Sequence, residues 1–331
     1  MTRYARWVPR LIGPAILVYF LLTTDVAKIV GNLRVLRWAP LLLSLALYPV
    51  MVAIKAWRWT VVMRSLGIRP PPLGASMTLY MIGLFLGGAT PGQSGDFVKA
   101  WYLRERGQPL APALFSILLD RLFDFLIMAM LSLVGLNAFL DRFPERLRVP
   151  IQGASVGLAA AAALMIPVLM ARRPRNWLMI QALRLTPRRA HTALERWRNQ
   201  LDSPDVPPAM LGSLLLATAC SAASVIARLW LLFSALDVGI PIPALVSSVA
   251  LISVVQVLPI SFAGVGVRDA VLIAVLAGYG YGPDKALALS ALFLLINLEH
   301  ILIGFLVSLR HPLGRAAAAD PQRASPSAAR S

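Results

Sequence analysis

Two short motifs bring glycines, a proline, an acid and a base together where an apolar segment breaks, at residues 89–99 and 259–269. Their glycines and charged residues are Gly92, Gly95, Asp96, Lys99, Gly264, Gly266, Arg268 and Asp269. Glycines permit tight turns and let a ligand approach the main chain. Broken apolar segments at corresponding positions of two halves are typical of a transporter's binding site. The motifs therefore favour movement of a molecule through a membrane over chemistry on it.

A second group of ionisable residues stands inside the apolar segment 113–140, where charges are costly and are functional candidates by default. Asp120 and Asp124 share a helix face at i,i+4, and Arg121 can reach Asp124 at i+3. Three preceding bases are available to close a salt-bridge network with them: Lys99, Arg104 and Arg106. The network either belongs to a pathway or only holds the first motif in place, and the sequence leaves both readings open.

Arg228, Glu299 and His300 also lie within long apolar segments. Arg228 is expected to face the bundle interior, toward Glu299 or Asp269, because a charge in the bilayer needs a partner or water. A purely structural pair with Glu299 is the alternative to a role in transport. Arg268, by contrast, is available to meet an anionic headgroup directly. His300 points about 100° away from Glu299 on a helix, which favours packing or hydrogen bonding over metal ligation.

Composition identifies a polytopic membrane protein. The chain is 58% hydrophobic and 14% charged, with a mean hydropathy of +0.71, whereas soluble domains contain about 25% charged residues. The net charge of +17 is concentrated in loops beside apolar spans, as cytoplasmic retention and anionic lipids favour, so nucleic acid is not an expected partner. The single cysteine, Cys220, excludes a disulfide framework and a cysteine metal site.

Apolar segments of about 20 residues are needed to cross roughly 30 Å of hydrocarbon. Six segments are candidates for full spans: residues 8–24, 38–54, 113–140, 153–171, 209–236 and 286–309. Three shorter apolar pieces flank the two motifs: residues 75–88, 243–258 and 269–278. The first of these pieces reaches only about 21 Å as a helix, and a lone crossing there would force the arginine-rich segment 172–198 outside. It is therefore predicted to enter the membrane and return.

The expected fold is an all-α polytopic membrane protein with about six full spans plus two re-entrant helical hairpins in an inverted-repeat arrangement. The second hairpin enters from the opposite face. Whether residues 243–258 stop midway or cross stays open, because both choices leave the C-terminus inside, and an eight-span description is then possible. Lysines and arginines cluster at four places: residues 3–10, 55–69, 172–198 and 310–330. These clusters and both termini are expected to be cytoplasmic, although the loops left outside also carry some bases.

Residues 1–310 are expected to form a single transmembrane domain. It has a cytoplasmic insert at 172–208, in which two short helices separated at Pro187 rest at the membrane interface. Residues 311–331, rich in Ala, Arg, Pro and Ser, are expected to be a disordered cytoplasmic tail. The pair Gly83 and Gly87 predicts close helix packing.

Sequence motifs for ATP hydrolysis, metal binding and serine hydrolases are absent or lack the structural context that they need. The chain has no Gly-x-x-x-x-Gly-Lys-Ser/Thr loop, so pumping driven by ATP is not expected. Only three histidines are present, so a histidine metal cluster is not expected either. The Gly-x-Ser-x-Gly pattern at residues 153–157 lacks a preceding strand and is attributed to chance. No cofactor and no enzymatic activity are predicted.

Five sequence pieces in order resemble the flippase-like membrane domain of lysylphosphatidylglycerol synthases and their stand-alone relatives. They are Ala56-Trp57-Arg58-Trp59, Thr90-Pro91-Gly92 through Gly95-Asp96 to Lys99, Leu103-Arg104, Asp120-Arg121-Leu122-Phe123-Asp124 and Gly264-Val265-Gly266-Val267-Arg268-Asp269. The resemblance covers roughly residues 10–310, and the family more often has Glu at the position of Asp120. It implies a polytopic helical fold with re-entrant helices and movement of a lipid headgroup between leaflets.

The resemblance does not extend to the soluble aminoacyl-transfer domain that the synthases carry after their membrane part, so lipid aminoacylation is not expected. Stand-alone relatives are tied to varied lipids, including hopanoid and polyprenyl-linked glycolipids. The cargo is therefore expected to be a membrane lipid with an anionic headgroup, without a more specific identity, and the expected location is a bacterial-type inner membrane. Homo-oligomers or lipid-synthesis enzymes are further possible partners.

The leading hypothesis is a lipid translocator in which the two motifs meet near mid-depth around a polar cavity. Lys99, Arg228 and Arg268 are the candidate phosphate ligands. The candidates for balancing charge or carrying protons are Asp120, Asp124 and Glu299. One alternative is a membrane-embedded lipid-modifying or glycosyl-transferring enzyme, for which Asp96 is the only candidate acid or base. A second alternative is a non-transporting scaffold of a lipid-synthesis complex.

Overall fold

The computed structural model describes residues 26–137, 145–185, 191–201, 207–257 and 266–311, and every regular element in these ranges is a helix. The elements are α2 (Val26–Arg34), α3 (Trp38–Ala46), α4 (Tyr48–Ser65), α5 (Leu73–Ala89), the 3-10 helix η2 (Pro91–Phe97), α6 (Val98–Glu105), α7 (Leu110–Asn137), α8 (Glu145–Met170), α9 (Arg172–Leu185), α10 (His191–Gln200), α11 (Pro208–Ala235), α12 (Ile242–Val257), α13 (Val267–Ala277) and α14 (Pro283–Arg310). The expected all-α class is confirmed for this part of the chain.

Three helical stretches are long and apolar enough to cross a membrane: Trp38–Ser65, Ala209–Ala235 and Pro283–Arg310. They correspond to three of the six predicted spans. α7 and α8 lie at two further predicted spans, and the predicted span at residues 8–24 is outside the described ranges. α7 has 28 residues, as α14 does, but it carries three charges in its middle. The apolar rule for spans therefore misses a helix whose charges are neutralised inside the bundle.

The predicted end of the second span was wrong. The helix continues from Leu47 through Ser65 rather than ending at residue 54, because the backbone bonds from Leu47 to Leu43 and from Met51 to Leu47 keep α3 and α4 in register. Lys55 and Arg58, which were expected in a cytoplasmic loop, therefore lie within α4. Their charges are tolerated there because acids on α7 face them, as described below.

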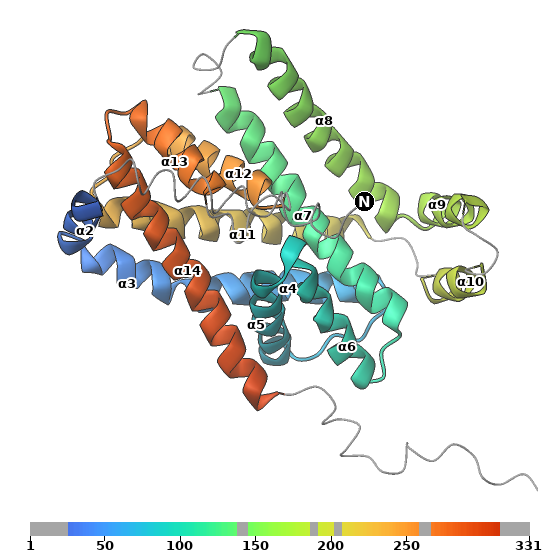
Figure 1. Ribbon diagram of the computed structural model, residues 1–331. Coiled ribbons are helices and arrows are strands. Elements are labelled where there is room, and N and C mark those ends of the chain that lie inside the picture. The colour runs from blue at the N-terminus through green and yellow to red at the C-terminus, as the bar shows by residue number, and fades with distance from the viewer. Residues whose placement is uncertain (1–25, 138–144, 186–190, 202–206, 258–265, 312–331) are drawn as a thin grey trace, which may run out of the picture.

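The α3–α4 rod and α11 pack side by side in opposite directions. The Arg37 amide donates to the Ala235 carbonyl at 2.9 Å, and farther along the Ser44 hydroxyl donates to the Arg228 carbonyl at 3.0 Å. In Figure 1, α12 and α13 lie above α11 while α5 and α6 lie below α4, so the helices that flank the two broken motifs extend to opposite sides of this pair. This antiparallel pairing is the relation that an inverted repeat requires.

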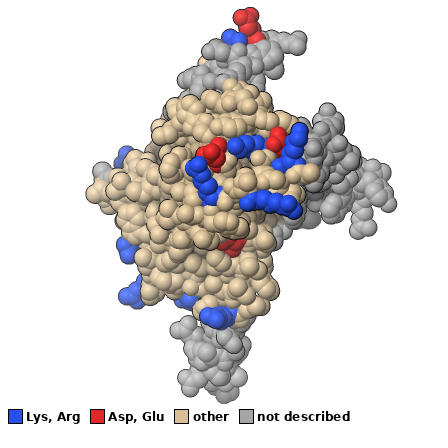
Figure 2. Space-filling view, turned by 90° about the vertical axis from the view of Figure 1, so that its left-hand side faces the viewer, with Lys and Arg blue, Asp and Glu red and all other residues tan. Residues whose placement is uncertain are grey.

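The two ends of the rod have different surfaces. α2 lies at one end of the molecule and the arginine-containing helices α9 and α10 at the other (Figure 1). Figure 2 shows the α2 end, where charged side chains of both signs gather. Here Arg37 pairs with Asp237 at 3.1 Å, and the Asn32 amide donates to Asp284 at 2.8 Å. The first contact joins the start of α3 to the connection between α11 and α12, and the second joins α2 to the start of α14.

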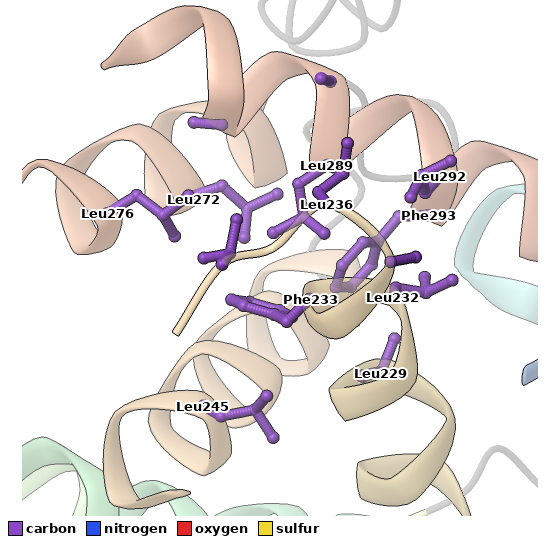
Figure 3. Packing of buried hydrophobic residues seen from close by; sticks show 14 of the residues in the cluster. Leu229, Leu232, Phe233, Leu236, Leu245, Leu272, Leu276, Leu289, Leu292 and Phe293 are labelled. Atoms are coloured by element: carbon purple, nitrogen blue, oxygen red, sulfur yellow. The ribbon is translucent and has the colours of Figure 1, made fainter. Parts of the chain in front are cut away.

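Buried apolar side chains form two clusters. One is built mainly from α4, α5, α6 and α7, with further residues from α8 and α11, and the other mainly from α11, α12, α13 and α14, with further residues from α2 and α3. In the second cluster, Leu232 and Phe233 of α11 point toward Leu289 and Phe293 of α14 (Figure 3). Lipid tails are as apolar as leucine, so close packing rather than water exclusion stabilises such contacts within a bilayer.

The first motif forms the turn of a helical hairpin, α5–η2–α6. The Thr90 hydroxyl donates to the Leu86 carbonyl and accepts from the Gly95 amide, both at 2.7 Å. A side chain at Gly95 would collide with the Leu86 carbonyl, so the predicted need for glycine at this turn is confirmed there. Gly92 also lies in η2. α5 and α6 contain 17 and 8 residues, or about 25 and 12 Å, which is too short for full spans, and their re-entrant insertion stays a prediction.

The second motif is described only from Gly266 onward, so Gly264 lies outside the described residues. Gly266 has φ +84°, where L side chains are strained, and it begins α13. The Asp269 carboxylate accepts from the Gly266 amide at 2.7 Å and closes this turn. α12 packs against α13 and also contacts η2, which brings elements of the two motifs together. Whether α12 crosses the membrane or stops within it stays a prediction.

The arginine-rich insert contains two short helices, α9 and α10, as expected. The predicted break at Pro187 lies between them, outside the described residues. Trp177 and Ile180 of α9 are exposed, in keeping with the expected position at a membrane interface. The cytoplasmic location of the insert and the disorder of the tail stay predictions.

Gly304→Ala in α14 is expected to destabilise the protein, because the added Cβ would collide with the Met81 carbonyl and with Phe85 of α5. Overpacking costs about 1–3 kcal/mol, against a gain in helix propensity of about 1 kcal/mol. The measurement is the thermal unfolding midpoint of the detergent-solubilised protein. Gly212→Ala in α11 is the matched control, since nothing lies within 4 Å of its Cβ position. Equal midpoints for both variants would contradict the assigned α5–α14 contact.

Candidate functional site

A first charge cluster lies between α4, the first hairpin and α7. Its members are Lys55, Arg58, Asp96, Lys99, Asp120, Arg121 and Asp124. These are four cations and three carboxylates, so the cluster has one positive charge in excess. The sequence analysis grouped Asp120, Arg121 and Asp124 and offered Lys99 as their partner. The fold adds Lys55 and Arg58 from α4 and Asp96 from the hairpin.

Arg58 is the centre of this cluster. It is fully buried, and its Nε donates to Asp120 Oδ1 at 2.8 Å while its Nη2 donates to the Asp120 carbonyl at 3.0 Å. Its Nη1 lies 2.8 Å from Asp124 Oδ1. The Tyr80 hydroxyl donates to the second oxygen of Asp120 at 2.8 Å, and Lys55 lies 3.0 Å from Asp124. α4, α5 and α7 are therefore joined by one polar network in which each carboxylate faces a cation, as a low-dielectric interior requires.

Asp96 joins the hairpin to α7. Its Oδ1 lies 2.8 Å from Lys99 Nζ, and its Oδ2 lies 3.1 Å from Arg121 Nη2. Lys99 Nζ also lies 4.1 Å from the centroid of the Tyr80 ring, within cation–π range. Gly83 of α5 makes this geometry possible, because a Cβ there would collide with Asp96 and crowd Lys99. The close packing predicted for the Gly83–Gly87 pattern is confirmed at Gly83.

One expected contact of the first charge cluster was wrong. Arg121 does not pair with Asp124 but reaches across to Asp96 on the hairpin, since Arg58 and Lys55 of α4 already hold Asp124. The i,i+3 spacing considers neighbours on one helix only, and a partner on another helix displaced it. Lys99 is part of the network as expected. In the described ranges no ion pair joins Arg104 or Arg106 to these carboxylates.

Lys55 and Arg58 are the site residues that sequence reasoning missed. They were counted as bases that follow a span. A signal was present, because the two lie three residues apart, on one face of a helix, and apolar residues continue on both sides as far as Met63. A helix reading of residues 48–65 would have placed them within a membrane helix, where a charge needs a partner or water.

A second charge cluster joins α11 to α14 and to the α3–α4 rod. Its members are Ser44, Tyr48, Arg228, Glu299 and His300. Arg228 Nη2 donates to Glu299, its Nε donates to the Ser44 carbonyl at 2.8 Å, and its Nη1 lies 2.9 Å from His300 Nε2. The His300 ring stacks on Tyr48 at 4.9 Å between centroids.

Of the two partners expected for Arg228, Glu299 is confirmed and Asp269 was wrong. His300 takes the predicted hydrogen-bonding and packing position. A guanidinium can only donate, so His300 Nε2 is the acceptor in this contact. The second charge cluster therefore binds its one arginine with a carboxylate, an imidazole and a backbone carbonyl.

A third polar group surrounds the start of α13. Arg268 Nε donates to the Ser290 hydroxyl of α14 at 2.9 Å, and this hydroxyl donates to Asp269 Oδ1. Arg268 Nη2 lies 3.7 Å from Asp269 Oδ1, and Arg268 is 1% exposed. Ser290 was not foreseen, because a serine in an apolar span carries no signal of its own.

The two halves of the chain repeat one arrangement. In the first half, Arg58 on the helix before the broken motif pairs with Asp120 on the long helix after it. In the second half, Arg228 and Glu299 stand in the same relation to the second motif. Each broken motif is thus bracketed by a buried ion pair between flanking helices, and the helices that carry the two arginines are antiparallel. The arrangement supports the predicted inverted repeat, while its orientation in a membrane stays a prediction.

Arg58→Leu is expected to lower the free energy of unfolding by about 3–5 kcal/mol, because removing one partner of a buried pair leaves the other charge uncompensated. Arg58→Leu combined with Asp120→Leu should recover part of that loss. Thermal unfolding in detergent measures both. Arg37→Leu is the matched control. Its pair with Asp237 has side chains 61% and 72% exposed and is worth less than about 1 kcal/mol. Equal losses at positions 37 and 58 would contradict the central place of Arg58.

Comparison with known proteins agrees with the resemblance drawn from the motifs. Residues 8–304 match the family described as the lysylphosphatidylglycerol synthase TM region. Among curated proteins, none matched the chain. The family match contains both broken motifs, all three polar groups and both bracketing ion pairs. Since it covers most of the 331 residues, this multi-pass membrane protein belongs to the lysylphosphatidylglycerol synthase TM region family.

Proposed function

We propose that this protein is a flippase-like lipid translocator, which moves the headgroup of a phospholipid or a polyprenyl- or hopanoid-type lipid between the leaflets of a bacterial inner membrane. Family membership supports a lipid-related role in the membrane. The observation that carries the proposal is the repeated arrangement in which each glycine-broken motif is bracketed by a buried arginine–carboxylate pair. A transporter needs two such elements, one for access from each side.

The pathway proposed here follows the polar groups from one motif to the other. Non-helical backbone at membrane depth is tolerated where protein or a water-filled cavity satisfies it, and the turn at Thr90 and Gly95 is satisfied by protein in this conformation. The contact between α12 and η2 supports a cavity shared by the elements of both motifs. We propose that separation of either bracketing ion pair, Arg58–Asp120 or Arg228–Glu299, admits a headgroup from one side of the membrane.

In this proposal the cations Lys99, Arg228 and Arg268 attract an anionic phosphate. The carboxylates balance their charge or carry protons as the headgroup passes, and they are Asp120, Asp124 and Glu299. The excess positive charge of the first charge cluster favours an anionic cargo. Both termini and the α9–α10 insert are assigned to the cytoplasmic side, following the arginines.

The enzyme alternative depends on Asp96, and the geometry disfavours it. Each oxygen of Asp96 is engaged by a cation, Oδ1 by Lys99 and Oδ2 by Arg121. A general acid or base must reach the proton of its substrate at about 2.6–3.2 Å. A carboxylate held on both oxygens serves better to fix the hairpin against α7 than to exchange protons with a substrate.

The test is flipping of fluorescent lipids in liposomes that contain the purified protein, measured by dithionite accessibility. Probes with anionic, zwitterionic and polyprenyl-linked headgroups are compared with protein-free liposomes. Wild type is expected to expose inner-leaflet probe, and Glu299→Gln is expected to slow this at least tenfold, since it leaves Arg228 without its carboxylate. Asp237→Asn, which neutralises an exposed acid at the α2 end, is the matched control and should flip at the wild-type rate.

Equal reconstitution and equal unfolding midpoints of the variants are required for this comparison. Absence of protein-dependent flipping with all three probes would reject the translocator. In that case a change of lipid mass on incubation with an activated donor would favour the enzyme alternative. A loss of flipping in Glu299→Gln that only follows a loss of folded protein would assign the pair a structural role.

A further inference from the structure

Arg268 differs from the other buried arginines in how its guanidinium is used. It is 1% exposed, and only its Nε donates a hydrogen bond, to Ser290 at 2.9 Å. Its Nη1 and Nη2 have no hydrogen-bond partner among the described residues. Arg58 and Arg228, by comparison, each place a terminal nitrogen against a carboxylate. A buried charged donor without an acceptor is costly, so its persistence needs an explanation.

The neighbouring carboxylate does not supply the missing acceptor. Asp269 Oδ1 already accepts from the Ser290 hydroxyl, and Oδ2 accepts from the Gly266 amide at 2.7 Å. The distance of 3.7 Å between Arg268 Nη2 and Asp269 Oδ1 exceeds that of a hydrogen bond. Asp269 therefore fixes the turn at Gly266 and neutralises part of the local charge, while the terminal nitrogens of Arg268 stay open to another anion.

The position of Arg268 adds a second attraction for an anion. It is the second residue of α13, an 11-residue helix that begins after Gly266. The N-terminus of a helix presents unsatisfied amide groups and the positive end of the helix dipole, which together bind phosphate. Phe293 of α14 lies 5.8 Å from the guanidinium carbon and covers one side of it, so the plane of the guanidinium is held. A planar guanidinium with two free nitrogens matches two phosphate oxygens.

We infer that the two free guanidinium nitrogens of Arg268, at the N-terminus of α13, are the principal contact for the phosphate group of the cargo. This inference rests on the proposed function and deepens it, because it assigns the phosphate to one of the three candidate cations. Lys99 and Arg228 then keep their carboxylate partners and hold the helices together. The ligand class is a phosphate mono- or diester, such as the headgroup phosphate of a glycerophospholipid or a polyprenyl phosphate.

The test compares wild type with Arg268→Met and Arg268→Lys in detergent, where binding is measured without transport. Each protein is titrated with dioleoylphosphatidylglycerol, with dioleoylglycerol as the tail without phosphate, and with inorganic phosphate. The unfolding midpoint and native mass spectrometry report binding. Arg37→Met removes an exposed arginine at the α2 end and is the matched control.

Wild type and Arg37→Met are expected to be stabilised by phosphatidylglycerol and not by dioleoylglycerol. Arg268→Met should need at least a tenfold higher lipid concentration for the same shift of the unfolding midpoint. Arg268→Lys should be intermediate, because lysine keeps the positive charge but lacks the planar guanidinium with its two terminal nitrogens. Because Arg268→Met leaves the buried Asp269 carboxylate without the cation 3.7 Å away, the unfolding midpoint of each variant without ligand is its own baseline. Binding is read only as the shift of the midpoint that the lipid adds to that baseline.

Stabilisation by inorganic phosphate that also depends on Arg268 would support the anion site and assign it to a free phosphate. Absence of stabilisation by any phosphate compound, or equal stabilisation of Arg268→Met and wild type, would overturn the inference. The outcome is separable from that of the flipping assay. Lipid binding that depends on Arg268 without flipping would reject the translocator alone, and flipping with binding indifferent to position 268 would reject the Arg268 site alone.

Discussion

The constraint on which this structure depends is that a charge inside a bilayer must meet an opposite charge or water. Arg58 meets that requirement with two acids of α7, and Arg228 meets it with Glu299 of α14. Each contact favours arrangements in which the two helices that carry its partners are neighbours, because separating them would leave a buried charge unpaired. The ion pairs therefore specify the order of the bundle, while apolar packing fills the space between them.

Glycine determines how closely the helices approach. At Gly83, Gly95 and Gly304 an added Cβ would meet an atom of a neighbouring element, so the hairpin, α5 and α14 form one tightly packed unit. This matters in a membrane because lipid competes equally well for apolar side chains, and close backbone contact provides the preference for protein. The same unit carries Asp96 and Lys99, so the spacing of the backbones and the geometry of the charges depend on each other.

A functional distinction follows from how each buried cation is satisfied. Cations that have a carboxylate at hydrogen-bond distance join helices, and their release requires another anion to replace that carboxylate. Arg268 is held in place by Ser290 and Phe293, but its terminal nitrogens have no hydrogen-bond partner among the described residues. Fixed position and unused bonding capacity are what preorganised recognition needs. In the proposed mechanism, the two bracketing pairs therefore hold the helices and this arginine binds the phosphate.

The sequence by itself determined the all-helical class of the described residues, the three long apolar helices, the break at the first motif, and Glu299 as one of two candidate partners of Arg228. Apolar runs specify helices directly, and an arginine in one long apolar segment has few acids to choose from. Tertiary structure alone decided that Arg58 pairs with Asp120, that Arg121 pairs with Asp96 and that Arg268 donates a hydrogen bond to Ser290. These partners come from different helices, 62, 25 and 22 residues apart. Spacing along one helix carries no information about which face of another helix will lie against it.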